Sequence, residues 1–414
     1  MKFQLEAITE PGRRLVTLAE ELAADFATRA AQHDREGSFA HENVEALRRT
    51  GYLAAPIPVE CGGLGVDSLH DILVASTRLA RGDASTTIGV NMHLGNALRQ
   101  VRGWRRALAG GDRARAARFA DAMEQIAAGD LVIAAGITEA GRELTEPATT
   151  ARREGDGWVI DGAKIFGTFA PGATHLTVSA TLVDEEGEDR YGMFAVPVAA
   201  AGVSVNDDWD ALGMRGSGSG SIALRAVHVP ASALRGEFPV GEWNPPVMER
   251  YMNAGLLHAS ASLGVAEAAH ALAIKGAATQ RKGRYARPLA ERPTIQILAA
   301  ENAIDMAAMR AVFARAALLV DCYVAEHMAS IGPDEEVCAV FTETQSAKTF
   351  VHLAALRIVD RAMTMFGGAG FMTKHPLSRL YRDVRAGPFM HPLGVNVAYE
   401  FIGQVILGLE PKVA

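Results

Sequence analysis

The stretch LVIAAGITEAGRELTEPATTARREGDGWVIDGAKIFGTFAPGATHLTVSATLV (residues 131–183) decides the fold, because it changes the character of the chain. It begins a series of short apolar runs, LVIAAGI, WVIDGAKIFG, HLTVSATLV, YGMFAVPV and SIALRAVHV, that ends near Pro230. Turn signals such as Gly155-Asp156-Gly157 and Asp161-Gly162 separate these runs. The spacing predicts a compact antiparallel barrel or sandwich, and not an alternation of strands and helices.

Helical periodicity dominates on both sides of this stretch. Ala, Leu, Arg and Glu are frequent before it, and two long segments with apolar stripes, Thr294–Glu326 and about 337–366, follow it. Their stripes are wider than one contact face, which favours a bundle that also makes subunit contacts. The predicted fold class is α+β, with an N-terminal helical domain (1–130), a middle β-domain (131–235) and a C-terminal four-helix bundle (236–414).

The composition excludes several classes of protein. Apolar residues make up 49% of the 414 residues, the ordinary level for a globular chain. The 41 basic and 48 acidic residues give a net charge of −7, so no nucleic-acid partner is expected. The three cysteines are far apart and suit neither a disulfide framework nor a metal site. The charged opening residues lack a signal core, and no long apolar run predicts a membrane span. We therefore expect a cytoplasmic protein without a bound metal.

The segment Gly136–Leu176 places hydroxyl and aromatic side chains after strand-like runs. Thr138 and Thr168 could bind the polar edge of a flat ring, with Phe166 against its face; alternatively, all three are ordinary residues of a β-domain. The glycine–serine run in Met214–Pro230 does not match a dinucleotide fingerprint, because a strand follows it and the last glycine is missing. No nicotinamide-binding domain is therefore expected.

The C-terminal half contains further candidates. Arg281 lies in the basic loop QRKGRYARPL, where guanidinium groups suit phosphate, although a solvated loop is the simpler interpretation. The glycines of MFGGAG permit close backbone approach at the end of a long helix. Arg382 and Asp383 are expected to form a structural ion pair. His391 lies in an apolar loop, where it is either a catalyst or a satisfied loop histidine.

Taken together and in this order, these segments resemble the acyl-CoA dehydrogenase superfamily. PVECGGLG is similar to its early P-x-E-x-G-G-L-G loop, and ITEAG with TTARREGDGWVIDGAKIFGT is similar to its T-E-P-G and G-x-K-x-x-x-T segments. LGMRGSGSGSIALRAVHVP resembles its barrel exit, and FGGAGFMTKHPLSRLYRD resembles its closing helical motif. The resemblance covers almost the whole chain and implies the three-domain fold of that family.

The resemblance also implies a bound flavin, FAD or FMN, at a site shared between the subunits of a homotetramer. It assigns positions to this cofactor as follows: Ile137 and Thr138 at the pyrimidine edge, Phe166 stacked on the ring, Thr168 hydrogen-bonded to it, and Arg281 (or Lys282), Gly367 and Gly368 at the cofactor of a neighbouring subunit.

The departures from the family pattern concern the catalytic base. Acyl-CoA dehydrogenases use a carboxylate to remove a proton while hydride leaves to the flavin. Counted from the Arg382-Asp383 pair, the position of the usual glutamate falls on His391. Glu249 is the nearest carboxylate candidate on a C-terminal helix. GRELTEP also replaces the usual turn after the T-E-P-G motif, which puts the thioester pocket in doubt.

A histidine in the last loop resembles the flavin-dependent monooxygenase branch of this fold, which includes dibenzothiophene monooxygenase and the nitrososynthases. That branch uses reduced flavin and O₂ through a C4a-hydroperoxide. The leading hypothesis is therefore a two-component monooxygenase that acts on a small organic substrate and receives reduced flavin from a separate reductase. His391 would be its catalytic acid–base group, with His93 a second candidate.

Two alternatives stay open. The chain is an acyl-thioester dehydrogenase with Glu249 as base, or a non-catalytic assembly partner that keeps the flavin fold.

Overall fold

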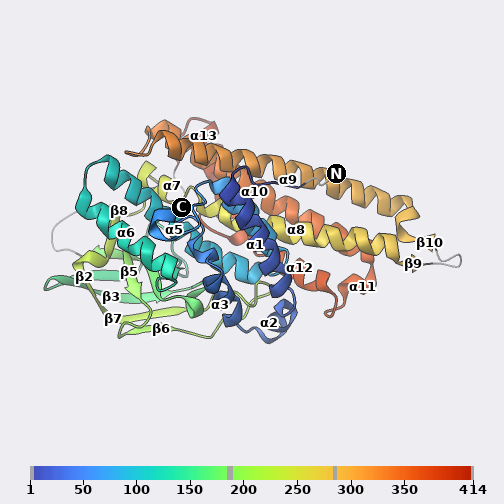
Figure 1. The fold of residues 1–414 in the computed structure, drawn as a ribbon, viewed down its shortest axis with the longest axis horizontal. Coiled ribbons are helices and arrows are strands. Elements are labelled where there is room, and N and C mark those ends of the chain that lie inside the picture. The colour runs from blue at the N-terminus through green and yellow to red at the C-terminus, as the bar shows by residue number, and fades with distance from the viewer. Residues whose placement is uncertain (1–3, 184–189, 283–286, 412–414) are drawn as a thin grey trace.

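Six helices precede the sheet in the computed structural model, which describes residues 4–183, 190–282 and 287–411 (Figure 1). Side-chain caps begin several of them, as Ser68 accepts from the Asp71 amide and Asp83 from the Ser85 amide. Every residue of α4 is buried, so this helix is the centre of the helical layer. The bounds are α1 (Glu10–Phe26), α2 (Ala30–Glu36), α3 (His41–Arg49), α4 (Leu69–Ala80), α5 (Ala84–Ala109) and α6 (Arg113–Ala128).

The middle of the chain forms one sheet in the order β6-β7-β3-β2-β4-β5-β8, with β1 also paired to β4. Most pairs are antiparallel, but β1 and β2 both run parallel to β4. This corrects the expectation of a purely antiparallel domain. β2 and β3 form a hairpin, and the chain then crosses back to place β4 on the far side of β2. The bounds are β1 (Ile133–Gly136), β2 (Thr150–Glu154), β3 (Gly157–Lys164), β4 (His175–Val183), β5 (Arg190–Pro197), β6 (Val203–Val205), β7 (Ile222–Pro230) and β8 (Leu234–Pro239).

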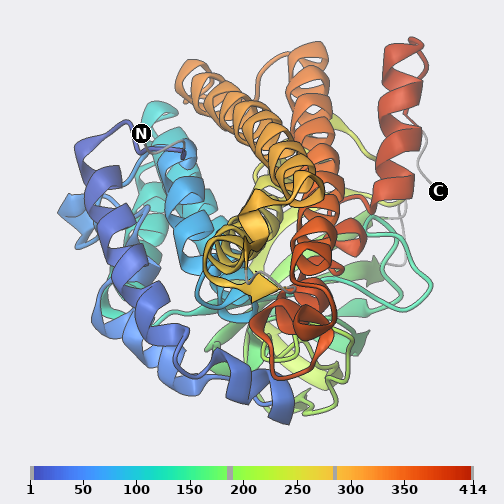
Figure 2. The ribbon, with the colours of Figure 1, turned by 90° about the vertical axis from the view of Figure 1, so that its right-hand side faces the viewer.

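Helices return after β8 and include three long ones, α8, α9 and α10, which pack together. Shorter helices complete this helical layer, and α13 stands at its edge in Figure 2. The bounds are α7 (Pro245–Tyr251), α8 (Ala254–Thr279), β9 (Arg281–Lys282), β10 (Arg287–Pro288), α9 (Pro293–Glu326), α10 (Asp334–Phe366), α11 (Gly368–Phe371), α12 (Pro376–Val384) and α13 (Val395–Ile406).

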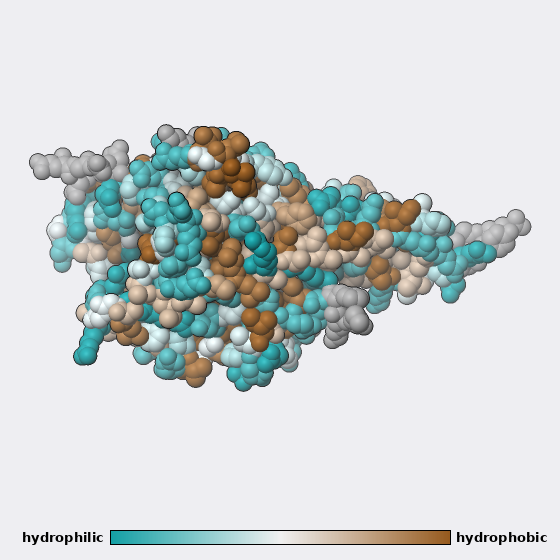
Figure 3. Space-filling model, turned by 90° about the horizontal axis from the view of Figure 1, so that it is seen from above, coloured by the Kyte–Doolittle hydropathy of each residue, from teal (hydrophilic) through white to brown (hydrophobic). Residues whose placement is uncertain are grey.

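The α8–α9 end of the molecule projects as an arm that carries apolar side chains on its surface (Figure 3). Ile297 and Ile304 of α9 are 59% and 69% exposed. The predicted α+β class and the helix–sheet–helix order are confirmed. Within the described residues, no helix is long and apolar enough to cross a membrane.

Candidate active site

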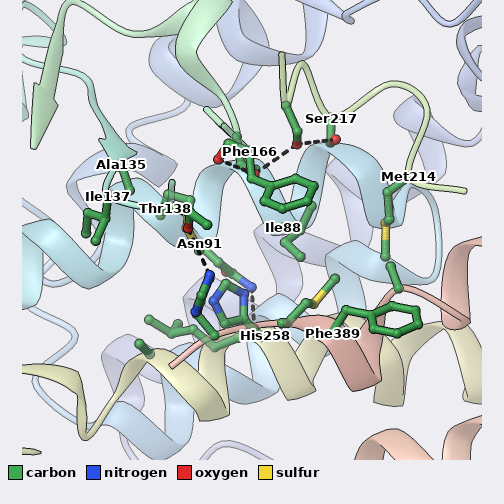
Figure 4. Close-up of a pocket in the computed structure, with 18 of the residues that line it drawn as sticks. Ile88, Asn91, Ala135, Ile137, Thr138, Phe166, Met214, Ser217, His258 and Phe389 are labelled. Carbon is green, nitrogen blue, oxygen red and sulfur yellow. Dashed lines mark hydrogen bonds between the residues drawn. The ribbon is translucent and has the colours of Figure 1, made fainter. Parts of the chain in front are cut away.

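A cavity of about 430 Å³ lies where the sheet meets helices α5 and α8 and the 385–391 segment. Figure 4 shows the Phe166 ring projecting into this space from the β-domain, with Ile88 and Phe389 nearby. Most of the lining surface is apolar, and none of the described residues that line the cavity is Asp or Glu. A reaction inside it therefore has no carboxylate from these residues as its base.

A chain of three hydroxyl groups runs along the β-domain side of the cavity. Thr168 Oγ1 lies 2.9 Å from Ser219 Oγ, which lies 2.6 Å from Ser217 Oγ. All three residues line the cavity. Sequence reasoning named Thr168 but missed the two serines, because it treated the glycine–serine run only as a failed phosphate loop. Their alternation with glycine was the available signal.

Two loops that carry these hydroxyls are joined by backbone hydrogen bonds. The Gly167 amide donates to the Gly220 carbonyl (2.9 Å) and the Phe169 amide to the Ser217 carbonyl (3.1 Å). Phe166 has φ 54°, an unusual value for a residue with a side chain. Its side chain is 51% exposed although it lines the cavity, so the ring face is available to a ligand.

The motif residues Glu139 and Lys164 form a buried pair that holds the same wall in place. Lys164 Nζ donates to Glu139 Oε1 (2.5 Å) and to the Ser179 carbonyl (2.6 Å). The Ile165 amide also donates to the Thr138 carbonyl at 2.9 Å, which connects the two predicted flavin segments. The spacing of the G-x-K-x-x-x-T segment thus has a structural cause: its lysine anchors the strand from which Phe166 and Thr168 extend.

Thr138 and His391 meet across the cavity. Thr138 Oγ1 lies 2.8 Å from His391 Nε2, joining the β-domain to the C-terminal loop over 253 positions of sequence. Burial of this wall, with the nearby charge of Lys348, lowers the pKa of His391 to about 4. The imidazole is therefore neutral near pH 7, which differs from the near-neutral acid–base group expected from the sequence. A neutral ring can still donate or accept one hydrogen bond at Nε2.

His258 of α8 is a cavity residue that sequence reasoning missed. It lines the cavity (Figure 4), and its buried Nδ1 has no hydrogen-bond partner among the described residues. Burial, together with the charge of Lys348, lowers its pKa to about 3. Lys348 in turn donates to the carbonyls of Met390 and Leu393, both at 2.5 Å, and so fixes the loop that carries His391. Neither residue belongs to a recognisable motif, so only the packing of α8 and α10 identifies them.

His93 does not line the cavity. Its Nε2 donates to the Leu53 carbonyl at 3.0 Å, and its Nδ1 accepts from the Ile133 amide at 3.1 Å. The side chain is fully buried, and both ring nitrogens are occupied by backbone. This geometry gives His93 the structural task of joining α5 to β1, and it does not support the catalytic role considered from the sequence.

Glu249 also lies outside the cavity wall. Arg106 binds both of its oxygens, and the Tyr323 hydroxyl donates to Oε1 at 2.9 Å. Burial alone would raise the pKa of Glu249, but the hydrogen bonds and charge of Arg106 outweigh it and lower the pKa. A carboxylate held in this way has no free oxygen to accept a proton from a substrate. The structure therefore does not support Glu249 as a dehydrogenase base.

The other predicted cofactor residues lie at the projecting end of the molecule (Figure 1), and not at this cavity. Arg281 begins β9, and Gly367, with φ 66°, joins α10 to α11. A Cβ on Gly368 would meet no atom within 4 Å. The side chain of Lys282 lies outside the described residues. In a single chain these positions do not reach Phe166, as expected if they serve a neighbouring subunit.

The expected Arg382–Asp383 pair is wrong. Arg382 instead forms a bidentate pair with Asp34 of α2 (2.8 and 2.5 Å). Asp383 accepts from the Met214 amide at 2.7 Å, at a point where Met214 has φ 52°. Adjacent residues of a helix point in different directions, so they seldom pair with each other. The two side chains thus join α12 to two separate segments near the cavity.

The cavity residues fit a flavin ring. They combine an available aromatic face at Phe166, hydroxyl groups at Thr138 and Thr168, and a buried imidazole nitrogen of His258 that lacks a partner. Such a ring has two apolar faces and a polar edge, which these groups complement. Bound there, the flavin would supply electron transfer, while the chain supplies position, hydrogen bonds and exclusion of water.

Three parts of the chain match the domains of one family. The matches are acyl-CoA dehydrogenase N-terminal domain over residues 9–102, middle domain over 134–227 and C-terminal domain over 256–391. Amino sugar nitrososynthase RubN8 from Streptomyces rubradiris is 34% identical over 407 residues, or 98% of this chain and 92% of that protein.

Solved structures show the same relationship. KijD3, in complex with FMN and dTDP-3-amino-2,3,6-trideoxy-4-keto-3-methyl-D-glucose, superposes with a TM-score of 0.89 and 31% identity, covering 99% of this chain and 96% of the other. Dibenzothiophene monooxygenase TdsC from Paenibacillus sp. A11-2 shares the fold, with a TM-score of 0.82 and 23% identity over 97% of this chain and 99% of that one. This chain therefore belongs to the acyl-CoA dehydrogenase family. It is a flavin-dependent oxidoreductase whose relatives include the monooxygenase branch, as the last loop predicts.

Proposed function

We propose that this protein is the oxygenase of a two-component system that oxidises the amino group of a nucleotide-linked amino sugar. The observation that carries the proposal is the Thr138–His391 contact in a cavity whose described lining residues include no carboxylate. A dehydrogenase needs such a carboxylate, whereas an oxygenase needs a dry wall with few polar groups. The similarity to RubN8 and KijD3 supports the choice of an amino sugar as substrate.

The chain's residues would divide the work between positioning and proton handling. Phe166 would contact the face of the flavin, and Thr168, with Ser219 behind it, would hydrogen-bond its edge. The neutral His391 would be held at the cavity wall by the Thr138 hydroxyl, which bonds its Nε2. Because its pKa is about 4, His391 would not release a stray proton near neutral pH. The apolar lining would keep water from the reacting oxygen.

The overall reaction balances with O₂ as oxidant and the reduced flavin as electron donor. A first turnover converts R–NH₂, O₂, two electrons and two protons into R–NHOH and water. A second, with the same inputs, converts R–NHOH into R–N=O and two waters. In the first turnover one N–H bond breaks and the N–O bond forms. In the second, the remaining N–H bond and the O–H bond of the hydroxylamine break, and the N–O bond becomes double.

The cofactor and assembly follow from the same proposal. The flavin would arrive reduced from a separate reductase in the same compartment, the cytoplasm. FMN in the KijD3 complex favours FMN, while FAD would need its adenosine part to reach Arg281, Gly367 and Gly368 of another subunit. We propose a homotetramer in which Arg281, Gly367 and Gly368, which do not line the cavity of their own chain, approach the cofactor of another subunit. Chromatography of the released flavin and sedimentation of the purified protein test the cofactor and the assembly.

The experiment that tests the proposal supplies a flavin reductase, NADH, flavin, O₂ and a dTDP-linked 3-amino sugar. Mass spectrometry should show a hydroxylamine and a nitroso product, each with one added oxygen atom that is ¹⁸O when ¹⁸O₂ is supplied, and the nitroso product also lacking two hydrogens. Rapid mixing of the reduced complex with O₂ should show a transient near-ultraviolet absorbance before the oxidised-flavin band returns. Featureless reoxidation with no labelled product, together with oxidation of acyl-CoA esters, would overturn the proposal in favour of a dehydrogenase.

A further inference from the structure

The cavity extends along one face of α5. Ile88, Met92, Gly95 and Arg99 all line it, at intervals of three or four positions. Ile88 and Arg99 are 11 positions apart, which corresponds to about 16 Å along a helix. Ile88 and Phe166 both line the cavity and appear close together in Figure 4, and from the length of helix between Ile88 and Arg99 we infer that Arg99 lies away from the predicted flavin ring.

Arg99 has no anionic partner within the described part of the chain. Its guanidinium donates to Asn96 Oδ1 at 2.7 Å, and no described carboxylate forms an ion pair with it. Asn96 Oδ1 also accepts from Thr177, so this oxygen is a shared neutral acceptor and not a counter-charge. An arginine has five donors, so most of those of Arg99 are left for another acceptor.

The groups around Arg99 add positive charge. Burial, followed by the charge of Arg250, lowers the pKa of Arg99 to about 9, and Arg102 acts in the same direction. Glu249, whose charge acts on the neighbouring Arg102, is already bound by Arg106 and Tyr323. Tyr251 also lines the cavity; its hydroxyl is buried beside Arg250, and it meets no carboxylate or carbonyl among the described residues. This end of the cavity therefore has unused donors and positive charge together.

We propose that Arg99 and Tyr251 form an anion subsite, at which the substrate's phosphate or carboxylate binds while its reacting group lies beside His391. The inference rests on the proposed function, since it names the part of the substrate that this cavity would recognise. Charge-assisted hydrogen bonds from a planar guanidinium suit either oxyanion. The distance along α5 separates this anion from the flavin ring, so both would occupy the cavity together.

The test measures binding to the flavin-loaded protein by calorimetry, without turnover. The probes are dTDP, thymidine and glucuronate, and the variants are Arg99→Gln and Arg99→Lys. Arg105→Gln is the matched control, because Arg105 lies on the same helix, pairs with Asp67 at 2.7 Å and does not line the cavity. Thermal melting and flavin content check that each variant folds.

We expect wild type to bind dTDP more tightly than thymidine, and Arg99→Gln to weaken dTDP about 10- to 100-fold while leaving thymidine unchanged. The affinity of Arg99→Lys for dTDP should lie between those of wild type and Arg99→Gln, and the affinity of Arg105→Gln should match that of wild type. The same pattern with glucuronate in place of dTDP assigns the subsite to a carboxylate.

Two results would overturn the subsite. One is an unchanged affinity for both anions in Arg99→Gln and Arg99→Lys. The other is a loss of FMN binding, without a loss of riboflavin binding, in the Arg99 variants. That result would show that Arg99 binds the flavin phosphate. Because no turnover is measured, failure of amine oxidation would refute the proposed function alone and leave the subsite standing.

Discussion

Glu249 and His391 both belong to the C-terminal part of the chain, and each could be taken for the catalytic group. Glu249 makes bidentate contact with Arg106 and accepts from Tyr323 away from the cavity. His391 lines the cavity, and the single side chain that bonds its ring is Thr138 among the described residues. The difference teaches that a place on the cavity wall, more than residue type, marks the functional group.

The largest effect is expected at His391. His391→Asn would lower the oxygenation rate about 100-fold or more, because it removes the imidazole that Thr138 orients. Since the pKa of His391 is about 4, the wild-type rate should show no ionisation of this group between pH 6 and pH 8. Steady-state oxygenation assays from pH 6 to pH 8 measure the rate loss in the variant and the pH dependence of the wild-type rate. Wild-type rates in the variant would place the catalytic group elsewhere.

Glu249→Gln should lower stability and leave activity nearly unchanged, which is the reverse of the effect expected for His391→Asn. Breaking the buried pair with Arg106 should lower the free energy of unfolding by about 3–5 kcal/mol, while the rate per folded molecule stays near wild type. Glu343→Gln is the control, because its pair with Arg315 is exposed and screened by solvent. Urea unfolding and activity assays separate the two effects. Loss of activity without loss of stability in Glu249→Gln would restore it as a catalytic base.

The buried Lys348 should make the free energy of unfolding depend on pH. Burial lowers its pKa to about 7 in the folded chain, against about 10.4 when unfolded. Between these values the unfolded chain binds more protons at this residue, so its contribution makes stability rise with pH. Lys348→Met should remove that part of the rise, whereas the exposed Lys374→Met should not. Urea unfolding at pH 7 to pH 10 measures how steeply the free energy of unfolding rises with pH in each protein. The same slope in wild type and both variants would contradict the lowered pKa of Lys348.

The smallest effect is expected in the hydroxyl chain. Ser219→Ala removes the partner of Thr168 and should weaken flavin binding by about 1 kcal/mol. Ser221→Ala is the control in the same loop, because Ser221 bonds Asp208 outside the cavity. Fluorescence titration of the flavin measures both affinities. Equal losses would show that the loop, and not the hydroxyl chain, determines binding.

Much of the site could be predicted from the sequence because its motifs are local. Ile137, Thr138, Phe166 and Thr168 follow strands whose apolar runs and turns are readable, and all four line the cavity. His258 and Ser219 could not be selected, since each becomes functional only through what packs opposite it. Glu249 and His93 were plausible by residue type, and the partners that satisfy them come from distant segments.

The sequence by itself determined the helix–sheet–helix order, the turns and the local motifs, because periodicity and turn chemistry act over a few neighbouring residues. Tertiary structure alone decided which polar groups remain unsatisfied. It joined Thr138 to His391, saturated Glu249, and left Arg99 without an anionic partner in the described part of the chain. Hydrogen-bond saturation and desolvation depend on groups brought together across hundreds of positions, so no local pattern records them.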